Sequence, residues 1–173
     1  KIRLDQFSRI SLDKYTTLVM VSGSYDQLDN KQIDKIKNWI EDGNTLITIA
    51  EGSSWAIDSD LINETLVKSI NDTTYSRKRY VDASEHIGRE RIGGIILNAD
   101  LDLTHPLAFG YHDKSIPVYK NNNVFINKTK DDYSSVAIYS EDFHIDGYIS
   151  ELNRKEFIPG AASLIVSNVG SGR

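Results

Sequence analysis

The first third of the chain alternates apolar runs with an amphipathic segment. Apolar runs predict strands at residues 16–21 and 45–50, and the continuous apolar end of the first is of the kind that a parallel sheet buries on both faces. The apolar residues between these runs recur at the spacing of one helix face: Ile33, Ile36 and Ile40. Because a parallel pair of strands requires a crossover of this kind, residues 15–50 predict a βαβ unit.

The expected helix has start and stop signals of its own. Asp29, with Gln32 three residues later, predicts a capping box. Leu28 and Ile33 are spaced to form the hydrophobic staple that accompanies such a cap. Gly43 is a typical stop, because glycine adopts the left-handed conformation without steric cost. We therefore expect a helix that begins just after Asp29 and ends before Gly43.

A second helix is predicted further along. Ser59 or Asp60 is a suitable N-cap for it. The apolar residues that follow recur at a spacing of four: Ile62, Leu66 and Ile70. The polar segment 71–91 then carries a basic run, Ser76–Arg79, which is typical of a solvated loop.

Short apolar runs separated by Asn, Asp, Lys and Gly predict strands in the rest of the chain. These runs span residues 93–97, 117–119, 124–126, 135–139 and 162–166. The expected architecture is an α/β fold with a mainly parallel sheet. That sheet holds the first two strands and is flanked by helices, and the C-terminal third adds extra β structure.

Composition narrows the classes of function. With 173 residues, 39% of them hydrophobic, the chain can form a core of its own, so residues 1–173 are expected to be a single domain. Its 25 acidic residues outnumber the 20 basic ones, and the net charge of -5 argues against a nucleic-acid partner. No apolar run approaches the roughly 20 residues of a membrane span. The first residues resemble a connector and the last ones a turn, so we expect a fragment of a longer multidomain protein.

The turn after the second expected strand is the main candidate site. In a nucleophile elbow the reactive residue follows a strand in a strained conformation, and a glycine two positions later lets the chain turn into a helix. Here Ala50 occupies the nucleophile position and Gly52 the glycine position. A methyl group cannot attack a substrate. The chain contains no cysteine, and Ser53 and Ser54 lack the flanking glycines of a serine elbow.

The strand and turn that end in Ile49-Ala50-Glu51-Gly52 resemble the class I glutamine amidotransferase-like fold. The corresponding turn of that fold carries a catalytic cysteine, any residue and a glycine. A closer resemblance, from about Tyr15 onward, is to the amidotransferase-like domain that follows the peptidase domain in certain bacterial zinc carboxypeptidase-like proteins. The runs that carry it are Arg79–Ser84, Ile92–Gly94, Asp102–Tyr111 and Asp146–Ser150, and Asp102–Tyr111 is the most specific.

This resemblance implies a flavodoxin-like three-layer sandwich. It also implies a parent protein that is an exported zinc metallopeptidase, extracellular or periplasmic, with the present chain as an accessory module. The partner would be the peptidase domain of the same chain, and this domain would have no cofactor of its own. The zinc is expected in the peptidase domain, because no histidine here has a glutamate three positions later, as the carboxypeptidase motif requires. Ala50 at the cysteine position implies a domain without catalytic activity.

His105 supports an alternative function. In active amidotransferases a histidine before proline activates the nucleophile, and His105 precedes Pro106 here. A hydrolase or small-ligand binder could reuse the elbow pocket through Glu51, Ser53 and His105, with the Glu51 carboxylate as general base. The simpler interpretation is that the His105 ring hydrogen-bonds a loop carbonyl beside a rigid turn. A third role would be to position peptide substrate for the attached peptidase.

Asp100 and Asp102, together with His105, have the donor types of a hard-metal site. Aspartates that follow a strand more often make turns or cap helices. We therefore predict a turn at this place and no metal site in the chain.

Overall fold

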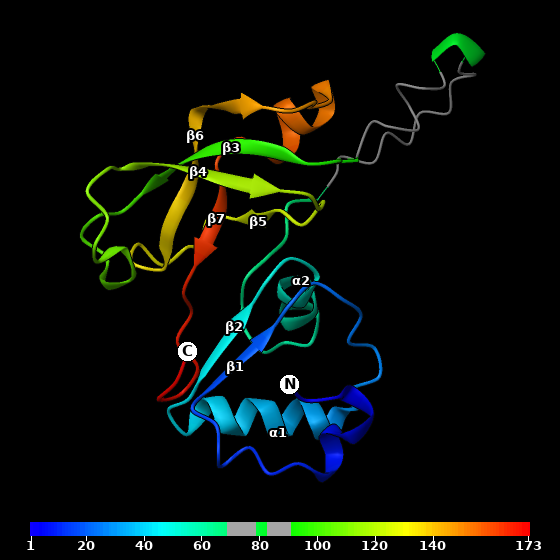
Figure 1. Ribbon diagram of the computed structural model, residues 1–173, viewed down its shortest axis with the longest axis vertical. Coiled ribbons are helices and arrows are strands. Elements are labelled where there is room, and N and C mark those ends of the chain that lie inside the picture. Colours follow the sequence, from blue (N-terminus) through cyan, green and yellow to red (C-terminus); the bar gives the residue numbers. More distant parts are fainter. Residues whose placement is uncertain (69–78, 83–90) are drawn as a thin grey trace. The chain divides into compact units, whose positions relative to one another are not determined.

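A computed structural model describes residues 1–68, 79–82 and 91–173. The chain divides into two compact units, and each is described by itself (Figure 1). The first unit consists of Lys1–Thr65 and Val166–Arg173, and the second of Leu66–Ile165. Most of the basic run that predicted a solvated loop lies outside the described residues, as does Ile70. The expectation of a single domain over residues 1–173 stays a prediction.

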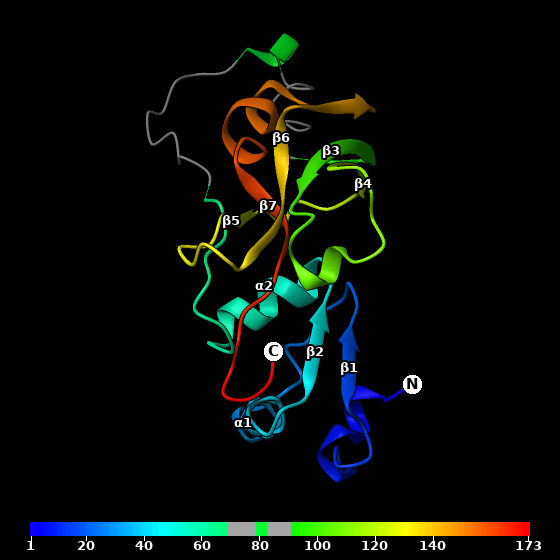
Figure 2. The same cartoon turned by 90° about the vertical axis from the view of Figure 1, so that its left-hand side faces the viewer.

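The first unit contains the predicted βαβ arrangement. Strand β1 (Thr17–Met20) and strand β2 (Thr45–Thr48) pair in parallel, with Thr17 opposite Thr45 and Met20 opposite Thr48. Helix α1 (Asn30–Glu41) connects them, and Figure 2 shows the two strands side by side and pointing the same way. The prediction for this part of the chain is confirmed.

Helix α1 begins and ends where its sequence signals predict. The Asp29 carboxylate accepts a hydrogen bond from the Gln32 amide at 2.9 Å, and the Gln32 side chain accepts one from the Asp29 amide at 2.9 Å. After the helix Gly43 has a φ of 105°, a conformation that disfavours side chains. Both ends of the helix are thus determined by residues within one turn of them.

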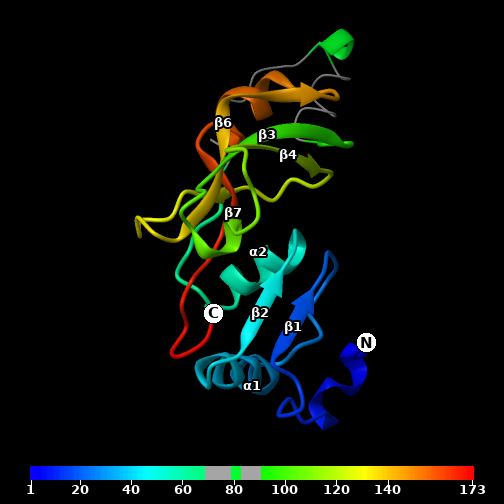
Figure 3. The same ribbon diagram turned by 60° about the vertical axis from the view of Figure 1, so that its left-hand side comes forward.

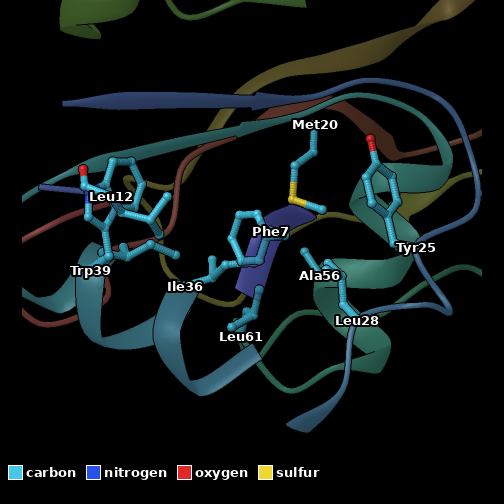
Figure 4. Close-up of a cluster of buried hydrophobic side chains, with 10 residues drawn as sticks. Phe7, Leu12, Met20, Tyr25, Leu28, Ile36, Trp39, Ala56 and Leu61 are labelled. Atoms are coloured by element: carbon cyan, nitrogen blue, oxygen red, sulfur yellow. The ribbon is translucent and has the colours of Figure 1, made fainter. Parts of the chain in front are cut away.

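One hydrophobic core supports the first unit (Figure 4). Helix α1 buries Ile36, Trp39 and Ile40, and the 3₁₀ helix η1 (Leu4–Arg9) adds Phe7. The Trp39 indole N–H donates to the carbonyl of Leu12 at 3.2 Å and to that of Tyr15 at 3.1 Å. These bonds satisfy the polar atom of an otherwise apolar core, which burial of tryptophan requires.

Only one face of the two-stranded sheet is packed in this core. Met20 is buried, whereas Val19, Val21, Ile47 and Ile49 on the other face are 45–57% exposed. The expectation that the first of these strands is buried on both faces is therefore wrong. Alternate residues of a strand point to opposite faces, and the core cluster contacts only one of those faces.

The second helix of the chain precedes the segment in which a helix was predicted. Helix α2 (Glu51–Asp58) follows β2 almost directly, as Figure 3 shows, and it ends where Asp60 adopts a φ of 53°. The helix predicted to start at Ser59 or Asp60 is absent from the described residues beyond that point. Leu66 instead forms an isolated antiparallel bridge with Ile126. Helix α2 starts at the bend and ends before Ile62 and Leu66. The apolar residues spaced four apart therefore lie beyond the helix and do not form its face.

The second unit is built on a five-stranded sheet in the order β4-β3-β6-β7-β5. All of its strand pairs are antiparallel. Its strands are β3 (Ile95–Leu101), β4 (Ser115–Lys120), β5 (Ile126–Asn127), β6 (Ser135–Asp146) and β7 (Ala161–Ile165). Short helical turns lie between them: η3 (Pro106–Ala108) and the π-helix η4 (Asn153–Phe157), while η2 (Tyr80–Asp82) precedes them.

This sheet corrects the predicted fold class. The only parallel pair among the described strands is β1 with β2, so the mainly parallel, flavodoxin-like three-layer sandwich is wrong. The runs predicted as strands in the last part of the chain overlap β3 to β7, although β3 and β6 extend further and β5 shares only Ile126 with its predicted run. These strands form an antiparallel sheet of their own, which the predicted fold class did not include. Parallel neighbours require long crossovers, usually helical, and the chain after residue 91 connects its strands by loops and short turns.

The expectation of no membrane-spanning segment agrees with this architecture. Among the described residues, no helix has both the length and the apolar character needed to cross a bilayer.

Candidate functional site

Ala50 forms a strained bend between β2 and α2. Its φ of 54° and ψ of -118° match the first central position of a type II′ turn, where glycine is strongly preferred. A non-glycine residue held in such a conformation costs on the order of 1–3 kcal/mol and is found mainly at functional sites. The structure therefore places Ala50 in the backbone geometry that the elbow pattern predicted for the nucleophile.

Gly52 allows the helix to begin against the end of β1. A β-carbon at Gly52 would lie 2.7 Å from the carbonyl oxygen of Met20 and 3.3 Å from that of Val21. The Gly52 amide donates to the Ile49 carbonyl at 3.1 Å, and the Ser53 amide donates to the Ala50 carbonyl at 2.8 Å. Backbone contacts this close leave no space for a side chain at this position.

Glu51 projects from the bend into solvent. Its carboxylate accepts a hydrogen bond from the hydroxyl of Ser22, which follows β1. In parallel strands the segments that follow both strands lie at the same edge of the sheet, which explains why these two residues meet. Sequence reasoning missed Ser22, although the predicted βαβ unit already placed the Ser22-Gly23-Ser24 turn at this edge.

Ser53 is turned inward from the bend. Its side chain is only 8% exposed, and its hydroxyl lies 3.0 Å from the hydroxyl of Thr48. Beside it, Tyr25 stacks obliquely on Trp55 with ring centroids 5.6 Å apart, and the Tyr25 hydroxyl donates to the Val21 carbonyl at 2.6 Å. Burial raises the pKa of Tyr25 above its ordinary value. These contacts hold the first turn of α2 in place.

His105 belongs to the second unit, whereas Glu51, Gly52 and Ser53 belong to the first. The ring Nδ1 of His105 accepts a hydrogen bond from the Leu107 amide at 3.1 Å, so the imidazole caps η3. We expected this ring to contact a loop carbonyl, and its partner is instead an amide donor. The interpretation of His105 as part of a rigid turn fits this geometry.

Asp102 makes a tight turn next to His105. Its carboxylate accepts hydrogen bonds from the Thr104 amide at 2.9 Å and from the Thr104 hydroxyl at 2.6 Å. These bonds, together with the nearby His105, lower the pKa of Asp102 below its usual value. Asp102 thus acts as the predicted turn former. Within the part of the chain that the structure describes, no cluster of three or more His, Asp or Glu residues is placed to hold a metal ion.

We compared the chain with known protein families, curated proteins and solved structures. No protein-family profile, curated protein or solved structure matches this chain.

Proposed function

We propose that this chain is a non-catalytic accessory module of an exported zinc carboxypeptidase-like metallopeptidase. The observation that carries the proposal is the bend at Ala50, with φ 54° and ψ -118°. The backbone has the form of a nucleophile elbow, and the residue at its apex presents a methyl group. In this proposal the elbow geometry is the remnant of an ancestral activity whose reactive side chain has been lost.

The attachment to a peptidase rests on the sequence resemblance alone, chiefly on Asp102–Tyr111. In this proposal the zinc is bound by the peptidase domain of the same chain, outside the cell or in the periplasm. The segment Asp102–Tyr111 also exposes large apolar side chains. Phe109 is 95% exposed and Tyr111 is 56% exposed. Apolar groups gathered on one exposed segment are typical of protein contacts, and we place the contact with the peptidase domain here.

The alternative hydrolase or small-ligand site has less support. The Glu51 carboxylate is exposed and bonded to Ser22, whereas a general base with a raised pKa needs desolvation. Ser53 is buried and paired with Thr48, so its hydroxyl is not presented to a substrate. Neither side chain has the environment that the alternative requires.

Hydrolysis assays test the absence of catalysis. We expect no release of ammonia from glutamine and no turnover of a small amide and ester library above the uncatalysed rate. Turnover that disappears in Glu51→Gln, Ser53→Ala or His105→Ala would overturn the proposal and establish the alternative.

Association tests the accessory role. The purified chain is expected to bind the separately expressed peptidase domain of the parent protein, and Phe109→Ser is expected to weaken that binding about tenfold, since a buried aromatic anchor contributes at least about 1.4 kcal/mol. Tyr133→Ser is the matched control, because Tyr133 is 84% exposed but lies elsewhere in the second unit. Equal binding by both variants and the unaltered chain would contradict the proposed contact.

The third role, positioning of peptide substrate, has its own test. The parent protein with and without residues 1–173 is compared on short and long peptides. If the module positions substrate, its removal lowers cleavage of the long peptides selectively. Equal rates on both classes exclude this role.

A further inference from the structure

A cavity of about 1050 Å³ opens within the second unit, and none of its lining residues belongs to the bend at Ala50. The end of β3, the first half of β6 and the π-helix η4 contribute to its lining. Its charged lining residues are Asp100, Asp102, Lys114, Lys128, Glu141 and Arg154. Sites for organic ligands typically enclose about 300–1,000 Å³, so this volume accommodates several linked residues rather than one amino acid.

Arg154 is the notable side chain of this cavity. It is half-buried, and among the described residues its guanidinium has no hydrogen-bond or ion-pair partner. Its neighbour Lys155 is exposed and pairs with Glu151 at 3.1 Å on the surface. A partly desolvated guanidinium without a counter-charge is unfavourable, and its planar fork of donors matches a carboxylate in a bidentate arrangement.

The backbone that carries Arg154 is itself irregular. Residues Asn153–Phe157 form a π-helix, in which the Ile158 amide donates to the Asn153 carbonyl at 3.1 Å. Such helices are rare and occur often at functional sites. Asn153 is 1% exposed, and its side-chain nitrogen is a buried polar atom without a hydrogen-bond partner among the described residues. Unsatisfied buried groups are uncommon in folded proteins. The turn that carries Arg154 thus combines two unfavourable features, the π-helix and the unpaired Asn153 nitrogen.

The charges of the lining restrict the ligand. Lys114 already pairs with Asp100 at 3.5 Å, and Asp102 is engaged by Thr104. Arg154 and Lys128 then supply positive charge, and Glu141 supplies negative charge. None of the three has a hydrogen-bond or ion-pair partner among the described residues. A phosphate would offer only negative charge, which suits Arg154 and Lys128 but not Glu141. A peptide offers a carboxylate to the cations and N–H donors to the carboxylates.

We propose that this cavity binds a short peptide with a free carboxylate. The carboxylate pairs with Arg154, supported by Lys128, and the amino or amide N–H groups of the peptide face Glu141. This site is separate from the bend at Ala50, so it does not depend on the proposed loss of catalysis.

Isothermal titration of the full chain with alanine tetrapeptides tests the proposal. The peptide with both termini free is expected to bind saturably, and its C-terminal amide about tenfold more weakly, because amidation removes the charge that pairs with Arg154. Arg154→Gln is expected to weaken binding of the free peptide to a similar extent, whereas Arg154→Lys retains part of it. Lys155→Gln is the matched control and leaves binding unchanged.

The proposal is overturned if the free peptide shows no saturable binding up to about 10 mM. That concentration is high enough to detect dissociation constants in the millimolar range. Equal affinity for the free and amidated peptides also overturns it, as does tighter binding of inorganic phosphate at Arg154. Circular dichroism checks that each variant is folded. If Arg154→Gln does not fold, the comparison of the two peptides on the unaltered chain still decides the question.

Discussion

The α-carbon of Gly52 faces the carbonyl oxygen of Met20 so closely that a β-carbon at Gly52 would lie 2.7 Å from that oxygen. The oxygen belongs to the backbone of β1, which cannot rotate away as a side chain can. The first turn of α2 and the end of β1 therefore fit together only because residue 52 is glycine. The geometry of the bend depends on this contact, because the contact sets how closely the first turn of α2 can approach the end of β1.

Gly52→Ala is expected to destabilise the first unit by about 2–4 kcal/mol, because the added methyl must displace backbone atoms. Urea denaturation followed by tryptophan fluorescence measures this, since Trp39 and Trp55 both lie in the first unit. Ser54→Ala, two positions further along the same helix, is the control and should shift stability by less than about 0.5 kcal/mol. A Gly52→Ala variant as stable as that control would contradict the close approach.

Ala50→Gly is expected to leave the stability of the first unit unchanged or to raise it by about 1 kcal/mol, because glycine adopts the positive φ of 54° without strain. Ala50→Val should lower stability by more than about 1 kcal/mol, since branching at the β-carbon worsens the clash in this conformation. The same denaturation measurement gives both values. If glycine destabilised and valine did not, residue 50 would not hold the observed conformation.

Asp29→Ala is expected to destabilise α1 by about 1 kcal/mol, because it removes the carboxylate that accepts the Gln32 amide hydrogen bond. Thermal unfolding by circular dichroism measures the change. Asp34→Ala, at an exposed position inside the same helix, is the control for loss of one negative charge. Equal effects of the two substitutions would show that the cap makes no specific contribution.

Tyr139 predicts a dependence of stability on alkaline pH in the second unit. Burial raises the pKa of Tyr139 from 10.0 to about 12, because the phenolate loses solvation. The folded state thus holds its proton more tightly than the unfolded chain. The resulting stabilisation is fully present below pH 10 and is lost as the pH rises toward 12. The loss is about 2 kcal/mol over that window.

Tyr139→Phe removes this contribution, so the variant should lose less stability than the unaltered chain between pH 10 and pH 12. Urea denaturation by far-ultraviolet circular dichroism at several pH values gives the comparison. Tyr133→Phe, at a side chain that is 84% exposed, is the control and should follow the unaltered chain. Parallel pH profiles for all three proteins would rule out a shifted Tyr139.

Sequence signals that act within a few residues were reliable in this protein. The capping box of Asp29 and Gln32 forms as predicted, and so does the stop at Gly43. The same holds for the pattern around Ala50 and Gly52, whose bend lies directly after a strand and before a helix. In each case a side chain or a backbone torsion determines its own neighbourhood, so the sequence carries the information locally.

Other features were decided by contacts between distant parts of the chain. The strands after residue 91 were located in part, but the short loops and turns that connect them, and not their composition, favour antiparallel pairing. Ser22 meets Glu51 only because two parallel strands end together. No sequence pattern marked Arg154 as a candidate. Its lack of a charge partner depends on which side chains lie near it in the folded chain.

The amino-acid sequence by itself thus determined the βαβ unit, both ends of α1, the approximate positions of the later strands and the methyl group at the bend. Tertiary structure alone decided how the later strands pair, which sheet face is covered and which charges line the cavity. The physical reason is the range of the interactions. Caps and turns are settled by neighbours in sequence, whereas strand pairing and burial depend on residues that only folding brings together.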